Sequence, residues 1–203
     1  ETCESFISTF FGEGSLTTEL APNPLQNGTN PSANSLKVVK AAGTNRWAGF
    51  QNPFAQNIDP NKTLKLKVYS TKADAVMRFE LNTDPQPPGS GNPPPQFRTV
   101  GPANTWVEIE VKFTDVPGSN TGLNQLVIKP DNPDGSDGGL TSSTETYYFD
   151  DLMLIDGEGN GGDDGGNDGG GDDSPDSGTN IAANGDFETG NDTGWILFQN
   201  GGT

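Results

Sequence analysis

The sequence predicts an all-β protein: a two-sheet antiparallel β-sandwich of the jelly-roll kind, followed by a flexible linker and the start of a second, similar module. Three observations predict it. Short runs alternate apolar and polar residues with a period of two, as strands with one buried face do. Gly, Pro, Asn and Asp recur between these runs and are typical of turns. Few stretches have the apolar spacing of an amphipathic helix.

The strand-like runs follow one another through the first part of the chain. In residues 63–70, three apolar side chains alternate with Lys65, Lys67 and Tyr69, which indicates one buried face and one wet face. Residues 75–82 repeat the pattern, with Arg78 and Glu80 outward. Further runs lie at residues 35–42, 45–54, 105–113, 123–130 and 146–155. Roughly eight short strands, each burying one face, are typical of a two-sheet sandwich.

Composition divides the chain into three parts. Residues 1–156 carry the strand-like runs and form the predicted sandwich module. Residues 157–178 contain no aromatic, branched aliphatic or basic side chain, so they bury too little surface to offset the entropy of ordering and are predicted to be a disordered linker. Residues 179–203 regain apolar anchors. Some 25 residues cannot form a core alone, so we expect this part to open a second module of a longer protein.

The charge balance limits the partners of the chain. There are 28 acidic and 11 basic residues and no histidine, which gives a formal net charge of -17. Nucleic acids and anionic membrane surfaces need clustered Lys and Arg, so this balance argues against both. It is compatible with neutral glycans or divalent cations. No run approaches the roughly 20 apolar residues of a membrane span, and with Cys3 as the only cysteine no intrachain disulfide is possible.

Three stretches resemble carbohydrate-binding modules of the family 4, 9 and 22 type. Residues 184–195 (NGDFETGNDTGW) resemble the opening strand of those modules, and residues 147–155 (YYFDDLMLI) resemble their closing strand. Residues 30–50 (NPSANSLKVVKAAGTNRWAGF) are similar to their early strands. The resemblance implies a non-catalytic module that binds a polysaccharide or oligosaccharide, within a multidomain bacterial protein that is secreted or displayed on the cell surface.

An aspartate pair interrupts the predicted closing strand. Asp150 and Asp151 should repel each other and resist desolvation there, unless a hard cation such as calcium accepts their oxygens. The resemblance implies a structural calcium between the first and last strands, with Asp151 and Asp150 as ligands and Glu13 as the opening-strand partner. The alternative is that the two aspartates alternate faces, one solvated and the other capping backbone amides.

A sugar site needs exposed aromatic planes beside side chains that hydrogen-bond to hydroxyl groups. Trp47, beside Arg46, is either such a platform or a core or rim tryptophan of the sandwich. Four other candidates lie on predicted strands or next to them and are either binding residues or a solvated strand face: Arg78, Glu80, Arg98 and Trp106. Trp106 has the opposite parity to Val107 and Ile109, which predicts an outward or edge position.

These features favour a carbohydrate-binding module whose fold is held by structural calcium. The alternative is a structural or adhesive sandwich that serves as a spacer in a bacterial surface protein. Catalysis is not expected, because the chain has no histidine and its carboxylates form no recognisable catalytic pair. We therefore expect no catalytic residue, although a glycoside hydrolase or polysaccharide lyase domain is a plausible neighbour in the same polypeptide.

Overall fold

The predicted all-β sandwich is confirmed by a computed structural model of the chain. The structure describes residues 15–53, 57–83, 92–114, 122–133, 139–155 and 196–198. These residues contain strands and turns and no helix, and so none of the described segments is a helix able to cross a membrane. Residues 1–14, the predicted linker and most of the predicted second-module fragment lie outside the described residues.

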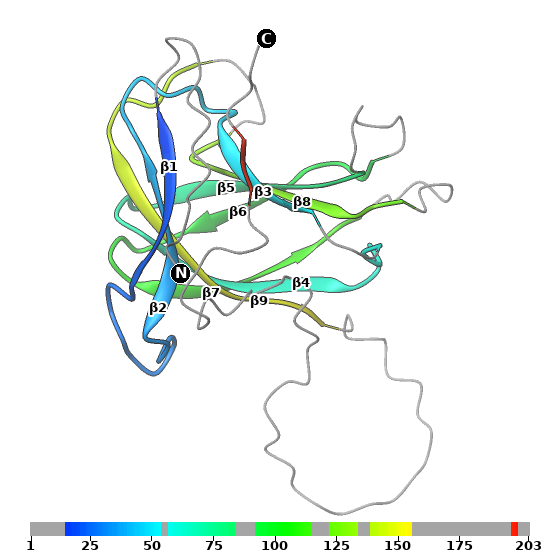
Figure 1. The fold of residues 1–203 in the computed structure, drawn as a ribbon, viewed down its shortest axis with the longest axis horizontal. Helices are drawn as coiled ribbons and strands as arrows, with labels where there is room; N and C mark the ends of the chain where they lie inside the picture. Colours follow the sequence, from blue (N-terminus) through cyan, green and yellow to red (C-terminus); the bar gives the residue numbers. More distant parts are fainter. Residues whose placement is uncertain are drawn as a thin grey trace, which may run out of the picture.

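Two five-stranded antiparallel sheets face each other (Figure 1). The first sheet, in spatial order, is β1 (Leu16–Pro22), β2 (Asn34–Lys40), β9 (Glu145–Ile155), β4 (Thr63–Ser70) and β7 (Trp106–Lys112). The second sheet, in spatial order, is β10 (Ile196–Phe198), β3 (Gly49–Pro53), β8 (Gln125–Pro130), β5 (Ala75–Asn82) and β6 (Gln96–Val100). Successive strands mostly alternate between the sheets, so residues far apart in sequence meet in one core.

The core lies between the sheets and follows from the period-two alternation. Every second residue of β4 and β5 points inward and is buried: Leu64, Leu66, Val68, Met77, Phe79 and Leu81. The rings of Phe50 and Phe149, from opposite sheets, meet edge to face with centroids 4.9 Å apart. Burying one such side chain contributes about 1.5–3 kcal/mol, so the alternation sets both the register and most of the stability.

The predicted run at residues 45–54 is wrong in its first half, because a strand begins only at Gly49. Residues 41–48 form a connection with its own hydrogen bonds: the Gly43 N–H donates to the Thr141 carbonyl (2.8 Å) and the Ala48 N–H to the Asn45 carbonyl (3.0 Å). Two strands within residues 1–156, β1 and β6, were not predicted. Their sequences, LTTELAP and QFRTV, do not alternate apolar and polar residues.

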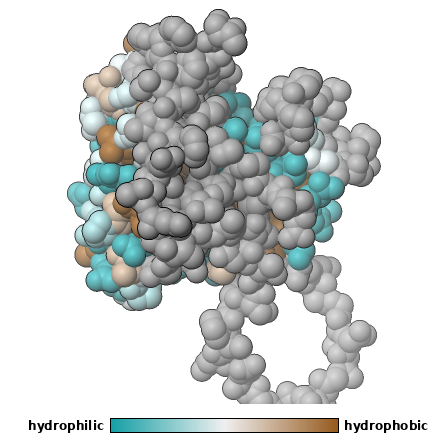
Figure 2. Space-filling model, in the orientation of Figure 1, coloured by the Kyte–Doolittle hydropathy of each residue, from teal (hydrophilic) through white to brown (hydrophobic). Residues whose placement is uncertain are grey.

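The described surface is largely polar. Figure 2 shows hydrophilic residues over most of the described surface in that view, with hydrophobic residues in small separate patches. Across the whole described part of the chain, the large hydrophobic side chains that are exposed are Leu25, Phe97 and Leu140. Exposed large apolar groups are therefore few among the described residues, and they lie singly rather than in one large patch.

Gly49 is required where β3 passes β8. A Cβ atom there would lie 2.3 Å from the Ile128 carbonyl oxygen, and that backbone oxygen cannot move away cheaply. We predict that Gly49→Ala lowers the free energy of unfolding by about 1–3 kcal/mol, as measured by chemical denaturation. Gly28→Ala is the matched control, because nothing lies within 4 Å of its Cβ position. Equal effects of the two substitutions would contradict this close approach.

Candidate functional site

The outer face of the second sheet carries two of the predicted sugar-binding side chains, Arg78 and Glu80. Met77 and Phe79 point into the core, so the residues between them and after them in β5, Arg78 and Glu80, point outward. Arg78 lies opposite Phe97 of β6 on one side and Lys129 of β8 on the other. We call the outward side chains of these three strands the Arg78 face: Val76, Arg78, Glu80, Phe97, Thr99, Val127 and Lys129.

Three charged side chains form an ion-pair group at the centre of the Arg78 face. The Glu80 Oε1 atom lies 2.7 Å from the Arg78 Nε atom and 2.7 Å from the Lys129 Nζ atom. Their side chains are only 10–15% exposed, so the attraction is less screened than between surface ions. One carboxylate oxygen therefore pairs with both the guanidinium and the ammonium.

Phe97 supplies an aromatic surface beside this group. Its side chain is 37% exposed, and it is the only aromatic residue among the exposed large hydrophobic residues of the described chain. The register places it directly across from Arg78. Sequence reasoning did not single out Phe97, because the direction of side chains within β6 cannot be read until its pairing with β5 is known.

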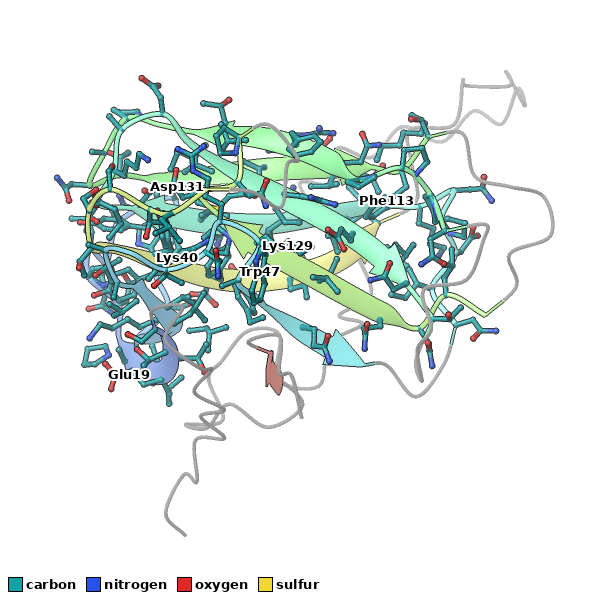
Figure 3. The ribbon with its side chains drawn as sticks, turned by 90° about the horizontal axis from the view of Figure 1, so that it is seen from above. Glu19, Lys40, Trp47, Phe113, Lys129 and Asp131 are labelled. Atoms are coloured by element: carbon teal, nitrogen blue, oxygen red, sulfur yellow. The ribbon has the colours of Figure 1, made fainter. Side chains whose placement is uncertain are left out.

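Trp47 lies in the connection just before β3, which fits the predicted rim position, and its role as a sugar platform stays a prediction. It is partly buried and packs against the core, while the rest of the side chain remains accessible. Two residues later, a Cβ atom on Gly49 would lie 2.9 Å from the Lys129 Cγ atom, so the start of the Lys129 side chain lies beside Gly49. Figure 3 labels Trp47 and Lys129 in this region. The side chain of Arg46 lies beside Gly139: a Cβ atom added to Gly139 would lie 3.8 Å from the Arg46 Cδ atom.

Arg98 does not join the Arg78 face. It lies opposite the inward-facing Met77, so its side chain leaves β6 on the core side and turns along the edge between the sheets. There Nε donates to the Glu110 carbonyl (2.5 Å) and Nη1 to the Phe97 carbonyl (2.7 Å). These bonds connect β6 to β7, which gives Arg98 a structural role in the described chain.

Trp106 points outward from the first sheet, as its parity predicts, but the expectation of an accessible ring is wrong. It is 2% exposed. Its Nε1 donates to the Asn23 Oδ1 atom at 2.9 Å, and its ring packs against Tyr69 with centroids 5.7 Å apart. Asn23 belongs to the connection between β1 and β2, which folds over the outer face. The alternation of apolar and polar residues along a strand does not show that a distant connection covers one of its side chains.

The aspartate pair lies at an irregularity of β9. The β4–β9 register shifts between Lys65 and Lys67, and Asp151 has a φ of 48°, as an extra residue at a β-bulge does. Asp150 is buried; Asn30 Nδ2 donates to its Oδ2 atom at 2.8 Å, and the Asp151 N–H donates to its Oδ1 atom at 2.9 Å. Asp151 forms an ion pair with the Lys67 ammonium.

The described residues around Asp150 and Asp151 do not test the predicted calcium site. Burial raises the pKa of the Asp150 carboxyl to about 7, although the hydrogen bond from Asn30 opposes the rise and the Asp151 charge adds to it. Among the described residues, no group of three or more His, Cys, Asp or Glu side chains gathers around a possible metal position. Glu13, the third predicted ligand, lies outside them. Calcium therefore stays a prediction here, and Lys67 and Asn30 are the partners that the described structure supplies.

Sequence reasoning missed the buried ammonium group of Lys40. Its Nζ atom donates to three backbone carbonyls: Arg46 (2.9 Å), Ala48 (3.0 Å) and Pro130 (2.6 Å). Burial lowers the pKa of this group to about 7, and the Asp131 carboxylate opposes the shift. Figure 3 shows Lys40 and Asp131 at the same end of the sandwich, away from Phe113. The available signal was parity, since Leu36, Val38 and Lys40 alternate along β2.

We predict that Lys40→Met lowers the free energy of unfolding by about 3–5 kcal/mol, because three buried carbonyls lose their donor. Chemical denaturation measures the change. Lys37→Met is the matched control on the same strand: its ion pair with Glu19 is more exposed, so the loss should stay within about 1 kcal/mol. Similar losses in the two variants would show that the Lys40 bonds contribute little.

Comparisons with known proteins give likenesses among solved structures. No family model matches the chain, and no curated protein matches it. One similar structure is described as a family 4 carbohydrate-binding module: identity 18%, TM-score 0.41, covering 59% of this chain and 82% of that one. A family 11 carbohydrate-binding module from Clostridium thermocellum, in complex with a β-1,3-1,4-mixed-linked tetrasaccharide, has 11% identity and a TM-score of 0.43, covering 75% and 87%. An arabinose-bound α-L-arabinofuranosidase has 16% identity and a TM-score of 0.41, covering 68% of this chain and 22% of that one.

Proposed function

We propose that this chain is a non-catalytic carbohydrate-binding module that binds a polysaccharide or oligosaccharide on the Arg78 face and attaches a secreted protein to it. The observation that carries the proposal is the juxtaposition of Phe97 with the Arg78–Glu80–Lys129 group. A sugar ring offers an apolar C–H face to an aromatic plane, and its hydroxyl groups bind charged donors and acceptors. The Arg78 face presents both kinds of partner on neighbouring strands.

Preorganisation favours this face over the other candidates. The guanidinium and the ammonium are already held by one carboxylate, so little side-chain entropy remains to be lost when a ligand binds. The outer face of the first sheet, in contrast, has its Trp106 ring enclosed by Asn23 and Tyr69. Trp47 extends the proposed site toward β3, where part of its side chain is accessible.

A structural or adhesive spacer is the competing function. It is favoured by the same observation that only one aromatic residue of the described chain is exposed, because a long sugar chain usually needs several ring platforms. A spacer would be retained by no polysaccharide in a binding assay, whereas a binding module would be retained by at least one.

We predict that Phe97→Ala weakens polysaccharide binding about tenfold, corresponding to ~1.4 kcal/mol, because the ring that stacks on the sugar is lost. Affinity electrophoresis in gels containing different polysaccharides measures the change. Leu25→Ala is the matched control, since Leu25 is similarly exposed (39%) but lies in the connection between β1 and β2. Retention that is unchanged by Phe97→Ala would exclude the Arg78 face, and no retention of the unaltered protein would favour the spacer.

Structural calcium is a separate proposal. An ion at the aspartate pair would have to draw Asp151 away from the Lys67 ammonium and take further oxygens from backbone carbonyls or water. Its stabilising effect would come from joining β9 to the sequence before β1, where Glu13 lies.

The calcium proposal predicts that a chelator lowers the unfolding temperature of the protein by about 4 °C or more, since each kcal/mol corresponds to roughly 2–4 °C at this size. Added calcium should reverse the change, and Asp151→Asn should abolish it. Asp59→Asn is the control, because the Asp59 carboxylate lies in an exposed turn and accepts from the Asn61 N–H. A melting curve that is the same with chelator and with calcium would reject the ion.

A further inference from the structure

Strand β10 is the one described strand that lies outside the sequence of the sandwich module. Its residues pair antiparallel with β3, Ile196 with Gln51, Leu197 with Phe50 and Phe198 with Gly49. Forty residues, numbers 156–195, separate it from the end of β9. At about 3.3–3.6 Å per extended residue, that length reaches any edge of either sheet. Chain connectivity therefore does not force β10 onto β3.

The edge of β3 differs in composition from the other edges of the two sheets. An open edge exposes unpaired N–H and C=O groups, and proteins usually protect it with charged residues. The edge strand β1 carries Glu19, β6 carries Arg98, and β7 carries Glu108, Glu110 and Lys112. The sequence of β3, GFQNP, contains no charged residue. Without β10, β3 would be the unprotected edge of the second sheet.

Strand β10 pairs with only the first three residues of β3, and neither strand contains a charged residue. Pro53 closes β3 at its far end, because proline has no N–H to donate, and β10 pairs only with Gly49, Phe50 and Gln51. The sequence of β10, ILF, belongs to residues 195–198, the longest apolar run after residue 156. An uncharged edge thus meets an uncharged strand-forming segment.

We propose that the edge of β3 is a strand-acceptor site whose occupant is the β10 segment of the same chain, and that this pairing latches the sequence after the linker onto the sandwich. Extended segments bind exposed sheet edges through main-chain hydrogen bonds, as in β-augmentation. The latch sets the position of whatever follows residue 198 relative to the Arg78 face of the same sheet. It is independent of the proposed carbohydrate binding.

The test uses the full chain with proline placed in β10. Consecutive N–H groups of a strand point to opposite sides, so one of Ile196→Pro and Leu197→Pro removes a donor to β3, and both restrict the backbone. Amide hydrogen exchange of β3 is the readout. We expect about tenfold or faster exchange at whichever of Phe50 and Gln51 faces β10. Gly201→Pro, outside the strand, is the matched control, and the Ile128 amide of β8 is the internal reference.

Each outcome decides the proposal. Faster exchange in both proline variants, with slow exchange restored by a synthetic peptide of residues 194–201, supports the acceptor site. Exchange at β3 that is the same in the proline variants and in the unaltered chain overturns it. Light scattering on the unaltered chain distinguishes the source of the strand: a monomer across concentrations supports pairing within one chain, whereas a concentration-dependent dimer with concentration-dependent protection of β3 overturns that assignment.

Discussion

The ammonium group of Lys40 forms the interaction on which one end of the sandwich depends. It binds the carbonyls of Arg46 and Ala48, which flank Trp47, and the carbonyl of Pro130, which ends β8 one residue after Lys129. Three chain segments from both sheets therefore meet at one buried cation. Because β3 begins at Gly49, directly after this anchored connection, the position of the strand-acceptor edge also follows from Lys40.

The outer faces of the two sheets differ in which side chains are exposed, although the strands of both sheets alternate in a similar way. On the second sheet, ion pairs hold Arg78 and Lys129 beside an exposed phenylalanine. On the first sheet, the aromatic rings of Tyr148, Tyr69 and Trp106 lie on adjacent strands β9, β4 and β7 but contact one another and are partly enclosed by the β1–β2 connection. Aromatic residues on the first sheet therefore stabilise the protein's own fold, whereas Phe97 on the second sheet is exposed.

At the aspartate pair, one extra residue in β9 changes which side chains point into the core. In regular alternation, Asp150 and Asp151 would point to opposite faces, and one of them would enter the core. The bulge at Asp151 restores Leu152 and Leu154 to the core while Lys67 and Asn30 bind the two carboxylates. Lys67 and Asn30 are thus the described side chains that act against the repulsion between the two carboxylates.

Alternation along residues 63–70, 75–82 and 105–113 was enough to predict β4, β5, β7, the sandwich and the outward direction of Arg78, Glu80 and Trp106. A strand has only two faces, and burial selects one of them. Which outward residues meet, and which are covered, depends on pairing between distant segments and has no local signature. Phe97 joins Arg78 through the β5–β6 register, Arg98 leaves that face through the same register, and Trp106 is buried by a connection more than 70 residues earlier in the chain. The Lys40 anchor needs carbonyls from two separate segments, and therefore exists only once the sheets have packed.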